Sequence, residues 1–203
     1  MWDGFLNSPL QCPQLPTAVS RVGWILSALI VGVFVCAIAA AQSDQPGEYD
    51  VKAAFLFNFT KFVEWPENAF VDSNAPIVIG VIGEDPFGES LVRIVAGQKA
   101  QGRGIEIAKY RYGDNLRRCH VLFISASERQ RRAQILASLQ EASVLTVSDI
   151  DGFAEAGGAI QFVVQENRVR FVVNLEVATQ GKLRVSAKLL ALARVINRSE
   201  AAR

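Results

Sequence analysis

Histidine and cysteine are scarce in this chain. Its 203 residues include one histidine, His120, and three cysteines, of which Cys12 and Cys36 lie among the first forty residues. The body of the chain therefore has one thiol, Cys119, beside its one imidazole. A zinc site needs three or four ligands, and a disulfide framework needs several cysteines. The sequence predicts neither a zinc site nor a disulfide-rich fold.

An excess of charge of either sign is also missing. The chain has 21 basic and 20 acidic residues. Removing residues 1–41 takes away Asp3 and Arg21, so 20 basic and 19 acidic residues remain and the balance is still +1. Binding to nucleic acid or to an anionic membrane surface rests on a basic excess. We therefore expect no nucleic acid partner.

The first forty residues have the layout of a secretory leader. Arg21 is followed by an apolar stretch that ends in Ala39-Ala-Ala41. This order of charge, apolar core and small residues is typical of a signal peptide cleaved before Gln42. An uncleaved membrane anchor is the alternative, because about 20 apolar residues can span a bilayer. We expect a signal peptide at 1–41, a spacer at 42–47, one domain at 48–198, a tail at 199–203, and export to the periplasm.

Hydrophobic periodicity predicts alternating helices and strands over the body of the chain. The expected elements are a helix at 48–65, a strand at 77–82, a helix at 86–96 capped by Asp85, strands at 105–111 and 120–125, a helix capped by Ser127 and ending at Leu139, strands at 144–147, 159–165 and 168–175, and a last helix at 187–197. This order is typical of the α/β class. We predict a single three-layer domain, with a mainly parallel sheet, helices on both faces and a C-terminal antiparallel hairpin.

The segment Val51–Pro66 is the richest in aromatic residues, with four phenylalanines and a tryptophan. At 100° per residue, Phe55 and most of the other rings fall on one face, which predicts a buried helix face. Asn58 falls within that apolar face, and Phe57 falls on the polar side. A buried amide needs a hydrogen-bond partner, so Asn58 either ties the helix to another element or contacts a ligand.

Other side chains have a structural and a binding interpretation. Phe57 either packs under a loop or contacts a partner, and Asn174 at the end of a strand either braces the hairpin or contacts a ligand. A pocket formed by Phe55, Asn58, Trp65 and Asn174 would suit a small aromatic ligand. Cys119 is either a buried thiol at the start of a strand or one half of an intermolecular disulfide.

Catalytic patterns are missing. The glycines between Gly80 and Gly88 do not have the spacing of a nucleotide-binding loop, and Glu84 and Asp85 would repel phosphate there. Cys119 and His120 are neighbours in a predicted strand, so their side chains point to opposite faces and cannot form a catalytic pair. The sequence predicts a protein that is not an enzyme and has no cofactor.

Seven short motifs occur together in this chain. They are A-A-F-L-F-N-F-T-K-F-V-E-W-P at 53–66, I-G-E-D-P-F-G at 82–88, C-H-V-L-F-I-S at 119–125, V-L-T-V-S-D at 144–149, G-F-A-E-A-G-G at 152–158, R-F-V-V-N-L at 170–175 and R-V-S-A-K-L-L-A-L-A at 184–193. Taken in this order, the motifs closely resemble those of the YfiR family of exported proteins, and the resemblance covers about residues 48–197.

The resemblance implies a non-enzymatic periplasmic regulator. The member that gives the family its name represses YfiN, an inner-membrane diguanylate cyclase, by binding its periplasmic sensor region, which affects cyclic di-GMP and biofilm formation. It also implies a possible homodimer, and other members serve receptors such as sensor kinases. Many members carry a cysteine where Gly80 stands here, able to pair with the cysteine matching Cys119, so the resemblance does not extend to that bridge. A periplasmic small-molecule-binding protein is the alternative function.

Overall fold

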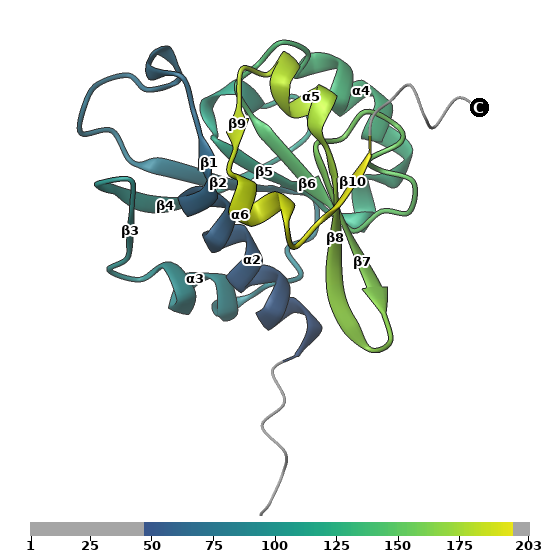
Figure 1. The fold of residues 1–203 in the computed structure, drawn as a ribbon. Helices are drawn as coiled ribbons and strands as arrows, with labels where there is room; N and C mark the ends of the chain where they lie inside the picture. Colours follow the sequence, from purple (N-terminus) through teal and green to yellow (C-terminus); the bar gives the residue numbers. More distant parts are fainter. Residues whose placement is uncertain (1–46, 197–203) are drawn as a thin grey trace, which may run out of the picture. The chain divides into compact units, whose positions relative to one another are not determined.

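The computed structural model describes residues 47–196, so the predicted leader at 1–41 and the tail at 199–203 lie outside the described residues. The fold is shown in Figure 1. Its helices and strands are α2 (Glu48–Phe62), β1 (Val63–Glu64), β2 (Ile77–Ile82), α3 (Glu89–Val95), β3 (Lys99–Ala100), β4 (Arg103–Tyr110), β5 (Val121–Ile124), α4 (Arg132–Ser138), β6 (Leu145–Ser148), β7 (Ile160–Gln165), β8 (Arg168–Asn174), α5 (Leu175–Gln180), β9 (Arg184–Val185), α6 (Ala187–Leu190) and β10 (Arg194–Ile196).

One eight-stranded sheet organises the domain, in the order β10-β8-β7-β6-β5-β2-β4-β3. Its centre is parallel, from β7 through β6, β5 and β2 to β4. The hairpin of β7 and β8 is antiparallel, and its turn residues Glu166 and Asn167 both have positive φ, as a tight two-residue turn requires. The predicted α/β fold class is confirmed.

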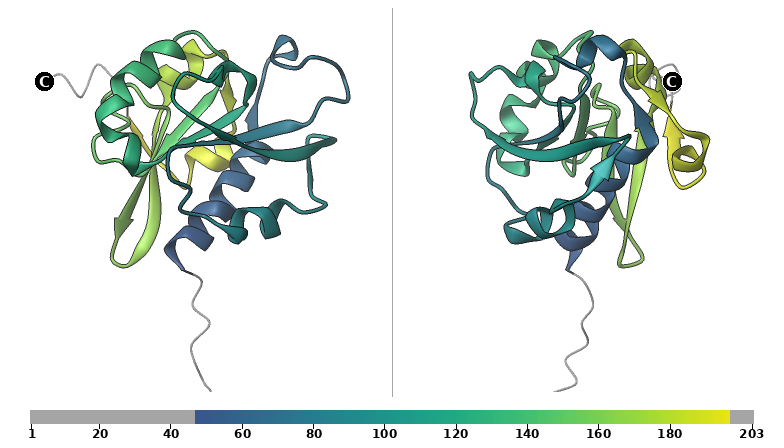
Figure 2. Two further views of the ribbon diagram at one scale, coloured as in Figure 1. Left: turned by 180° about the vertical axis from the view of Figure 1, so that it is seen from behind. Right: turned by 90° about the vertical axis from the view of Figure 1, so that its left-hand side faces the viewer.

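Both faces of the sheet are buried. In β5, Val121 and Phe123 belong to the larger core, with α2 and α3, whereas Leu122 and Ile124 belong to a second core, with α4. Alternate residues of a strand point to opposite faces, so a continuous apolar run is what a central strand covered on both sides requires. Figure 1 shows α2 and α6 in front of the sheet, and the view from behind in Figure 2 shows α4 in front.

The first helix ends earlier than the sequence predicts. It stops at Phe62, and Val63 and Glu64 form a short strand that pairs with β9 in a second, two-stranded sheet. Trp65 is therefore outside the helix. The cause is tertiary, because pairing with a segment about 120 residues later in the chain decides the conformation of Val63–Glu64, and the local apolar period does not.

Two helix starts also differ from the prediction. Asp85 accepts a hydrogen bond from the Phe87 amide at 2.9 Å in a turn, and α3 begins after Gly88, whose φ is +52°. The cap of the 3₁₀ turn that leads to α4 is Ser125 and not Ser127, because the Ser125 side chain accepts a hydrogen bond from the Ser127 amide. In both places an early polar residue forms a local turn that competes with the helix.

The C-terminal prediction of one long helix is wrong. The helix α6 covers Ala187–Leu190, with Ser186 as its cap, and β10 then runs parallel to β8. The short elements β3 and α5 were not expected either. A leucine- and alanine-rich sequence favours helix, but the free edge of β8 provides hydrogen-bond partners that turn Arg194–Ile196 into a strand.

Candidate functional site

A cluster of phenylalanines joins α2 to the β7–β8 hairpin. The ring of Phe55 lies 5.3 Å from that of Phe171 and 6.1 Å from that of Phe162, and Phe59 lies 5.4 Å from Phe171. Phe59, Phe162 and Phe171 are buried, whereas Phe55 is half-buried at the edge of the cluster. The aromatic core therefore reaches the surface at Phe55.

A surface cavity of about 220 Å³ opens at this edge. The six residues that line it are called the aromatic–arginine surface: Phe55, Arg168, Val169, Arg170, Phe171 and Leu192. Leu192 is 66% exposed. Figure 1 shows that the β7–β8 hairpin, which carries four of these residues, projects from the body of the domain. An exposed leucine beside half-buried Phe55 and Val169 gives this cavity an apolar lining open to a partner.

The charge of this surface is positive. Arg168 and Arg170 are exposed, and no carboxylate of the described residues lies within ion-pair distance of either guanidinium. Arg194 lines an adjoining cavity of about 240 Å³ together with Arg170 and Leu192, and its contact with Glu155 is long, at 3.9 Å. The surface therefore offers an apolar floor and guanidinium groups to an acidic partner.

Sequence reasoning proposed Phe55 as a contact residue in a pocket with Asn58, Trp65 and Asn174, none of which lines this cavity, and it missed the basic residues of the surface. In the predicted alternation of 168–175, Arg168 and Arg170 occupy the polar phase, so they could have been found as a pair of cations on one side of a strand. Leu192 could not, because the sequence predicts a helix at 187–197, whereas the helix ends two residues before Leu192. Its exposure follows from the turn between α6 and β10.

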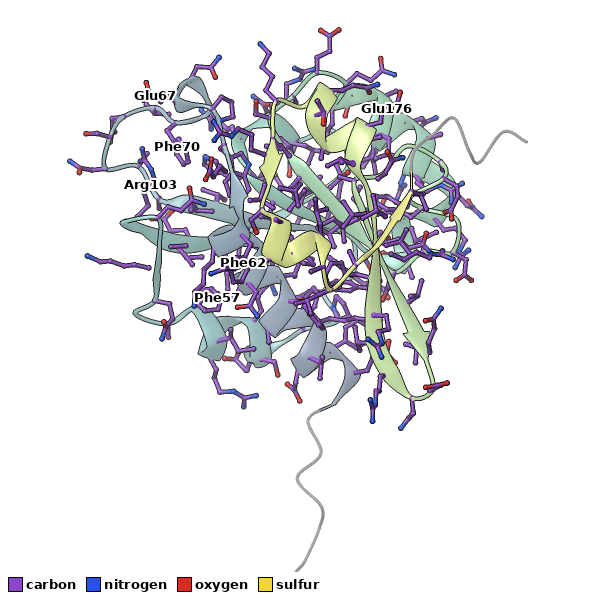
Figure 3. All side chains as sticks on the ribbon, in the orientation of Figure 1. Phe57, Phe62, Glu67, Phe70, Arg103 and Glu176 are labelled. Carbon is purple, nitrogen blue, oxygen red and sulfur yellow. The ribbon has the colours of Figure 1, made fainter. Side chains whose placement is uncertain are left out.

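Phe57 is not on an exposed face. It is 9% exposed and belongs to the same core as Leu91 and Val95 of α3, and the Lys61 Nζ lies 4.0 Å from the centre of its ring. Figure 3 labels Phe57 on α2, whose lower half packs beside α3. Of the two interpretations of Phe57, the structure favours packing, although against α3 and not under a loop, because α2 is covered on more than one side.

The other proposed contact residues divide into two kinds. Asn58 is half-buried, and a ligand or partner contact stays a prediction for it. Trp65 and Asn174 are buried. The indole of Trp65 donates to the His120 carbonyl at 3.1 Å. The Asn174 amide donates to the Ala154 carbonyl at 2.9 Å, and its oxygen caps α5.

Cys119 has the environment of a structural thiol. It is 2% exposed, its Sγ lies 3.0 Å from the Leu116 carbonyl oxygen, and burial raises its pKa to about 12. Disulfide formation requires an accessible thiolate. These facts favour the buried thiol over the intermolecular disulfide in the folded protein.

Gly80 is in close contact with Tyr110. A Cβ built on Gly80 would lie 2.7 Å from Tyr110 Cε2 and 3.1 Å from Leu122 Cδ1. Tyr110 packs against the core that also contains Cys119. The tyrosine ring therefore occupies the space that a side chain at position 80 would need, which fits the absence of a cysteine there.

The loop that follows β2 uses its polar groups internally. The Glu84 amide donates to Ser127 Oγ at 2.9 Å, and the Asp85 carboxylate pairs with Lys109 at 2.9 Å. Burial raises the pKa of Asp85, but the hydrogen bonds from Lys109 and from the Phe87 amide outweigh burial and leave that pKa lowered. Residues 47–196 contain no group of three or more histidine, cysteine or acidic side chains able to hold a metal ion.

The comparison with known families assigns nearly the whole described domain to one family. The pattern that defines the YfiR/HmsC-like family matches residues 49–194, from the first turn of α2 to the start of β10. The chain belongs to the YfiR/HmsC-like family. This confirms the resemblance drawn from the seven motifs. YfiR-like proteins are regulatory rather than catalytic and act in the periplasm, in diguanylate cyclase signalling. Within residues 47–196 no helix has the length and apolar character needed to cross a membrane.

Proposed function

We propose that this protein is an exported, non-enzymatic regulator that binds and restrains the periplasmic sensor region of an inner-membrane signalling protein. The receptor is a diguanylate cyclase or a sensor kinase, and its restraint lowers cyclic di-GMP and biofilm signalling. Membership of the YfiR/HmsC-like family supports this role. The observation that carries the proposal is the aromatic–arginine surface, where apolar side chains and arginines without acidic partners lie together.

The restraint follows from differential binding. A regulator shifts a receptor between two states only to the extent that it binds one state more tightly. A projecting hairpin with an aromatic base is a rigid platform for such recognition, because Phe171 is held by Phe55 and Phe59 before any partner arrives. Pre-ordered side chains lose less conformational entropy on binding.

Charge reversal on the hairpin tests the proposal. The receptor gene is expected beside the gene of this protein. The periplasmic domain of that receptor is purified for calorimetric titration against this protein. Arg168→Glu combined with Arg170→Glu is expected to weaken binding at least tenfold, since arginines at interface centres commonly contribute about 1–2 kcal/mol each. The matched control reverses Arg118 and Arg129, which are exposed and lie outside the aromatic–arginine surface, and it is expected to leave affinity within about twofold.

Deletion of the gene tests the cellular role. Cyclic di-GMP or kinase output is expected to rise when the protein is absent. The Arg168→Glu, Arg170→Glu variant, expressed in the deletion strain, is expected to fail to bring that output back down. Unchanged cyclic di-GMP and unchanged kinase output after deletion would refute the regulatory role. Equal weakening by the two charge-reversed variants would instead refute the aromatic–arginine surface as the binding site.

A further inference from the structure

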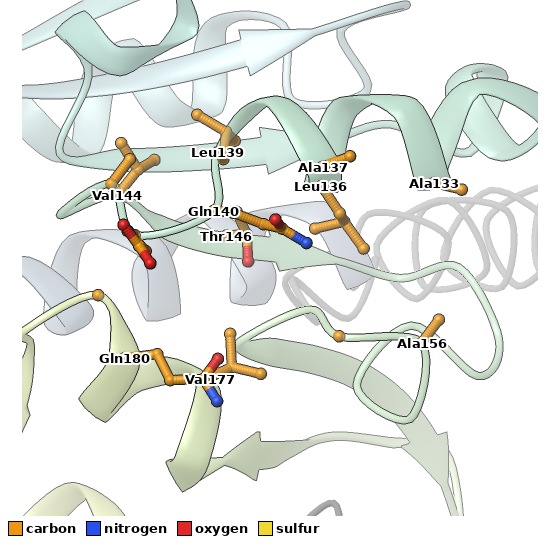
Figure 4. A pocket seen from close by; sticks show the side chains of 14 residues that line it. Ala133, Leu136, Ala137, Leu139, Gln140, Val144, Thr146, Ala156, Val177 and Gln180 are labelled. Carbon is orange, nitrogen blue, oxygen red and sulfur yellow. The ribbon is translucent and has the colours of Figure 1, made fainter.

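A further cavity lies where the segment of α4 meets β6 and α5. Its volume is about 200 Å³. Figure 4 shows it from close by, with Leu136 and Gln140 of the α4 segment and Thr146 of β6 on one side, and Val177 and Gln180 of α5 on the other. It does not include any residue of the aromatic–arginine surface.

The cavity exists because the sheet opens between β6 and β7. These strands pair at two positions, Val147 with Ile160 and Ser148 with Gln161, whereas β5 and β6 pair at four. Before β7 the chain bends away through Gly157, which has a φ of +99°. The Ala159 amide then bonds to the side chain of Thr146, at 2.9 Å. The gap beside the amino-terminal half of β6 is thus built into the backbone.

Small residues shape this gap. Three alanines leave its space unfilled, and a glycine allows the backbone to close one end of it. Ala133, Ala137 and Ala156 line the cavity. At the far end Gly181 approaches the Ala142 carbonyl so closely that a Cβ on Gly181 would lie 2.9 Å from that oxygen. Larger side chains at the alanines would fill the space, so the cavity depends on the residue types present.

One polar side chain that lines the cavity can donate a hydrogen bond to an occupant. Thr146 is 4% exposed, and its Oγ1 accepts the Ala159 amide. A threonine hydroxyl that accepts one hydrogen bond keeps its O–H as a donor. An oxygen or nitrogen acceptor that enters the cavity can therefore receive a hydrogen bond from Thr146.

The electrostatics of the cavity favour an uncharged occupant. Its walls are apolar at Leu136, Leu139 and Val177, and its rim carries the amides of Gln140 and Gln180. Among the lining residues, all of which are described, Glu141 is the one ionisable side chain. An anion would lose hydration and meet only a carboxylate, and a buried charge without a partner is strongly unfavourable. Both arguments exclude phosphates and carboxylates.

We propose that this cavity is a binding site for a small uncharged molecule with a compact apolar body and a carbonyl or amide group. Thr146 donates to the carbonyl, the two glutamine amides contact the polar edge, and the leucines and Val177 cover the apolar body. The size fits a single ring of about ten non-hydrogen atoms, since an apolar cavity of about 150 Å³ binds benzene. The site is separate from the proposed receptor surface and does not depend on it.

The test compares three molecules of one shape and different charge. Benzamide, benzoate and benzylamine are titrated into the ¹⁵N-labelled protein. Benzamide is expected to shift the backbone amide resonances of Thr146, Gly157 and Gly181 in a saturable way. Benzoate and benzylamine are each expected to bind at least tenfold more weakly, because no cation lines the cavity and its one anion, Glu141, is exposed to water, which screens its charge. Equal binding of benzamide and benzoate, or shifts centred elsewhere, would overturn the proposal.

Two substitutions locate the binding. Ala137→Trp fills the cavity and is expected to abolish the benzamide shifts, whereas Gln130→Trp, an exposed position outside the cavity, leaves them unchanged. Thr146→Val is expected to weaken benzamide binding at least fivefold, and Thr146→Ser to retain it. Retained binding in Ala137→Trp would contradict the site. Because receptor binding uses a different surface, Ala137→Trp is expected to bind the receptor normally.

Discussion

Lys52 and Asp149 form an ion pair inside the protein, with 2.6 Å between the lysine Nζ and Asp149 Oδ2. They are 97 positions apart in the chain and their side chains are 3% and 12% exposed. The Tyr49 hydroxyl donates to the same carboxylate oxygen at 2.9 Å, and Glu48 lies 2.6 Å from the lysine Nζ. This network fastens the first turns of α2 to the carboxyl end of β6.

Removing one partner of this pair is expected to destabilise the protein strongly. Burial lowers the pKa of Lys52, but its hydrogen bonds to Asp149 and Glu48 outweigh burial and leave that pKa raised. Lys52→Met leaves the Asp149 carboxylate buried without its cation, at a cost of about 3–5 kcal/mol. The double variant Lys52→Met, Asp149→Leu is expected to recover most of this loss. Urea unfolding at pH 7 measures both free energies.

The exposed pair of Glu64 and Arg184 provides the control. Their side chains are 61% and 85% exposed, with 3.3 Å between the charged atoms. Arg184→Met is expected to change the free energy of unfolding by at most about 1 kcal/mol, because water screens such pairs. Similar losses for Lys52→Met and Arg184→Met would contradict the special role of the buried pair.

His120 is expected to make stability depend on pH. It is 6% exposed, its ring stacks on Phe70 at 4.5 Å, and its Nδ1 accepts the Val78 amide at 3.0 Å. Burial lowers the pKa of His120, and the positive charge of nearby Arg103 lowers that pKa further. The Ala69 carbonyl raises the pKa but does not offset burial, so the pKa stays lowered. Figure 3 shows Phe70 and Arg103 beside each other at this corner of the domain.

The direction of the effect follows from proton linkage. With a lowered pKa in the folded state, the unfolded chain binds more protons, so the free energy of unfolding rises with pH. The stabilisation is complete above the unfolded pKa of about 6.5 and is lost as the pH falls below it. Urea unfolding between pH 8 and pH 5 measures the slope, and His120→Gln is expected to reduce it. An unchanged slope in His120→Gln would assign the pH dependence to other groups.

The central strands could be predicted from the sequence because both of their faces are buried. Ile77–Ile82 has the same bounds in the sequence and in the structure, and the alternation of 159–175 gave the hairpin and its turn. Elements that depend on distant partners could not be found in this way. β1 exists because β9 lies beside it, and β10 because β8 has a free edge.

Exposure on α2 could be predicted only in part. A single apolar stripe implies one covered face, but α2 packs against α3, the sheet and α6, so Phe57 is buried on a side that the period assigns to solvent. The aromatic–arginine surface joins Phe55 to residues more than 110 positions later. A single sequence contains the residue types but not this juxtaposition.

A cysteine at position 80 is expected to destabilise this protein rather than bridge to Cys119. Its Cβ would lie 2.7 Å from the Tyr110 ring, and overpacking of a core usually costs about 1–3 kcal/mol. Gly80→Cys combined with Tyr110→Ala is expected to relieve much of that cost. The control is Gly104→Cys, where no atom lies within 4 Å of the added Cβ. Thiol counting by mass spectrometry, with and without reductant, shows whether a bridge forms; a stable Gly80→Cys protein with a bridge to Cys119 would contradict the packing argument.

Cys119 is expected to resist alkylation until the domain opens. Its pKa of about 12, against 9.0 for a free thiol, leaves about a thousandfold less thiolate at neutral pH, and burial blocks access. Iodoacetamide is expected to modify Cys119 only at the rate of unfolding, which denaturant raises, whereas Ser73→Cys in an exposed loop reacts within minutes. Peptide-level mass spectrometry separates the two positions. Rapid labelling of Cys119 in the folded protein, or a dimer crosslinked through it without reductant, would show that the thiol is accessible and restore the intermolecular disulfide as an explanation.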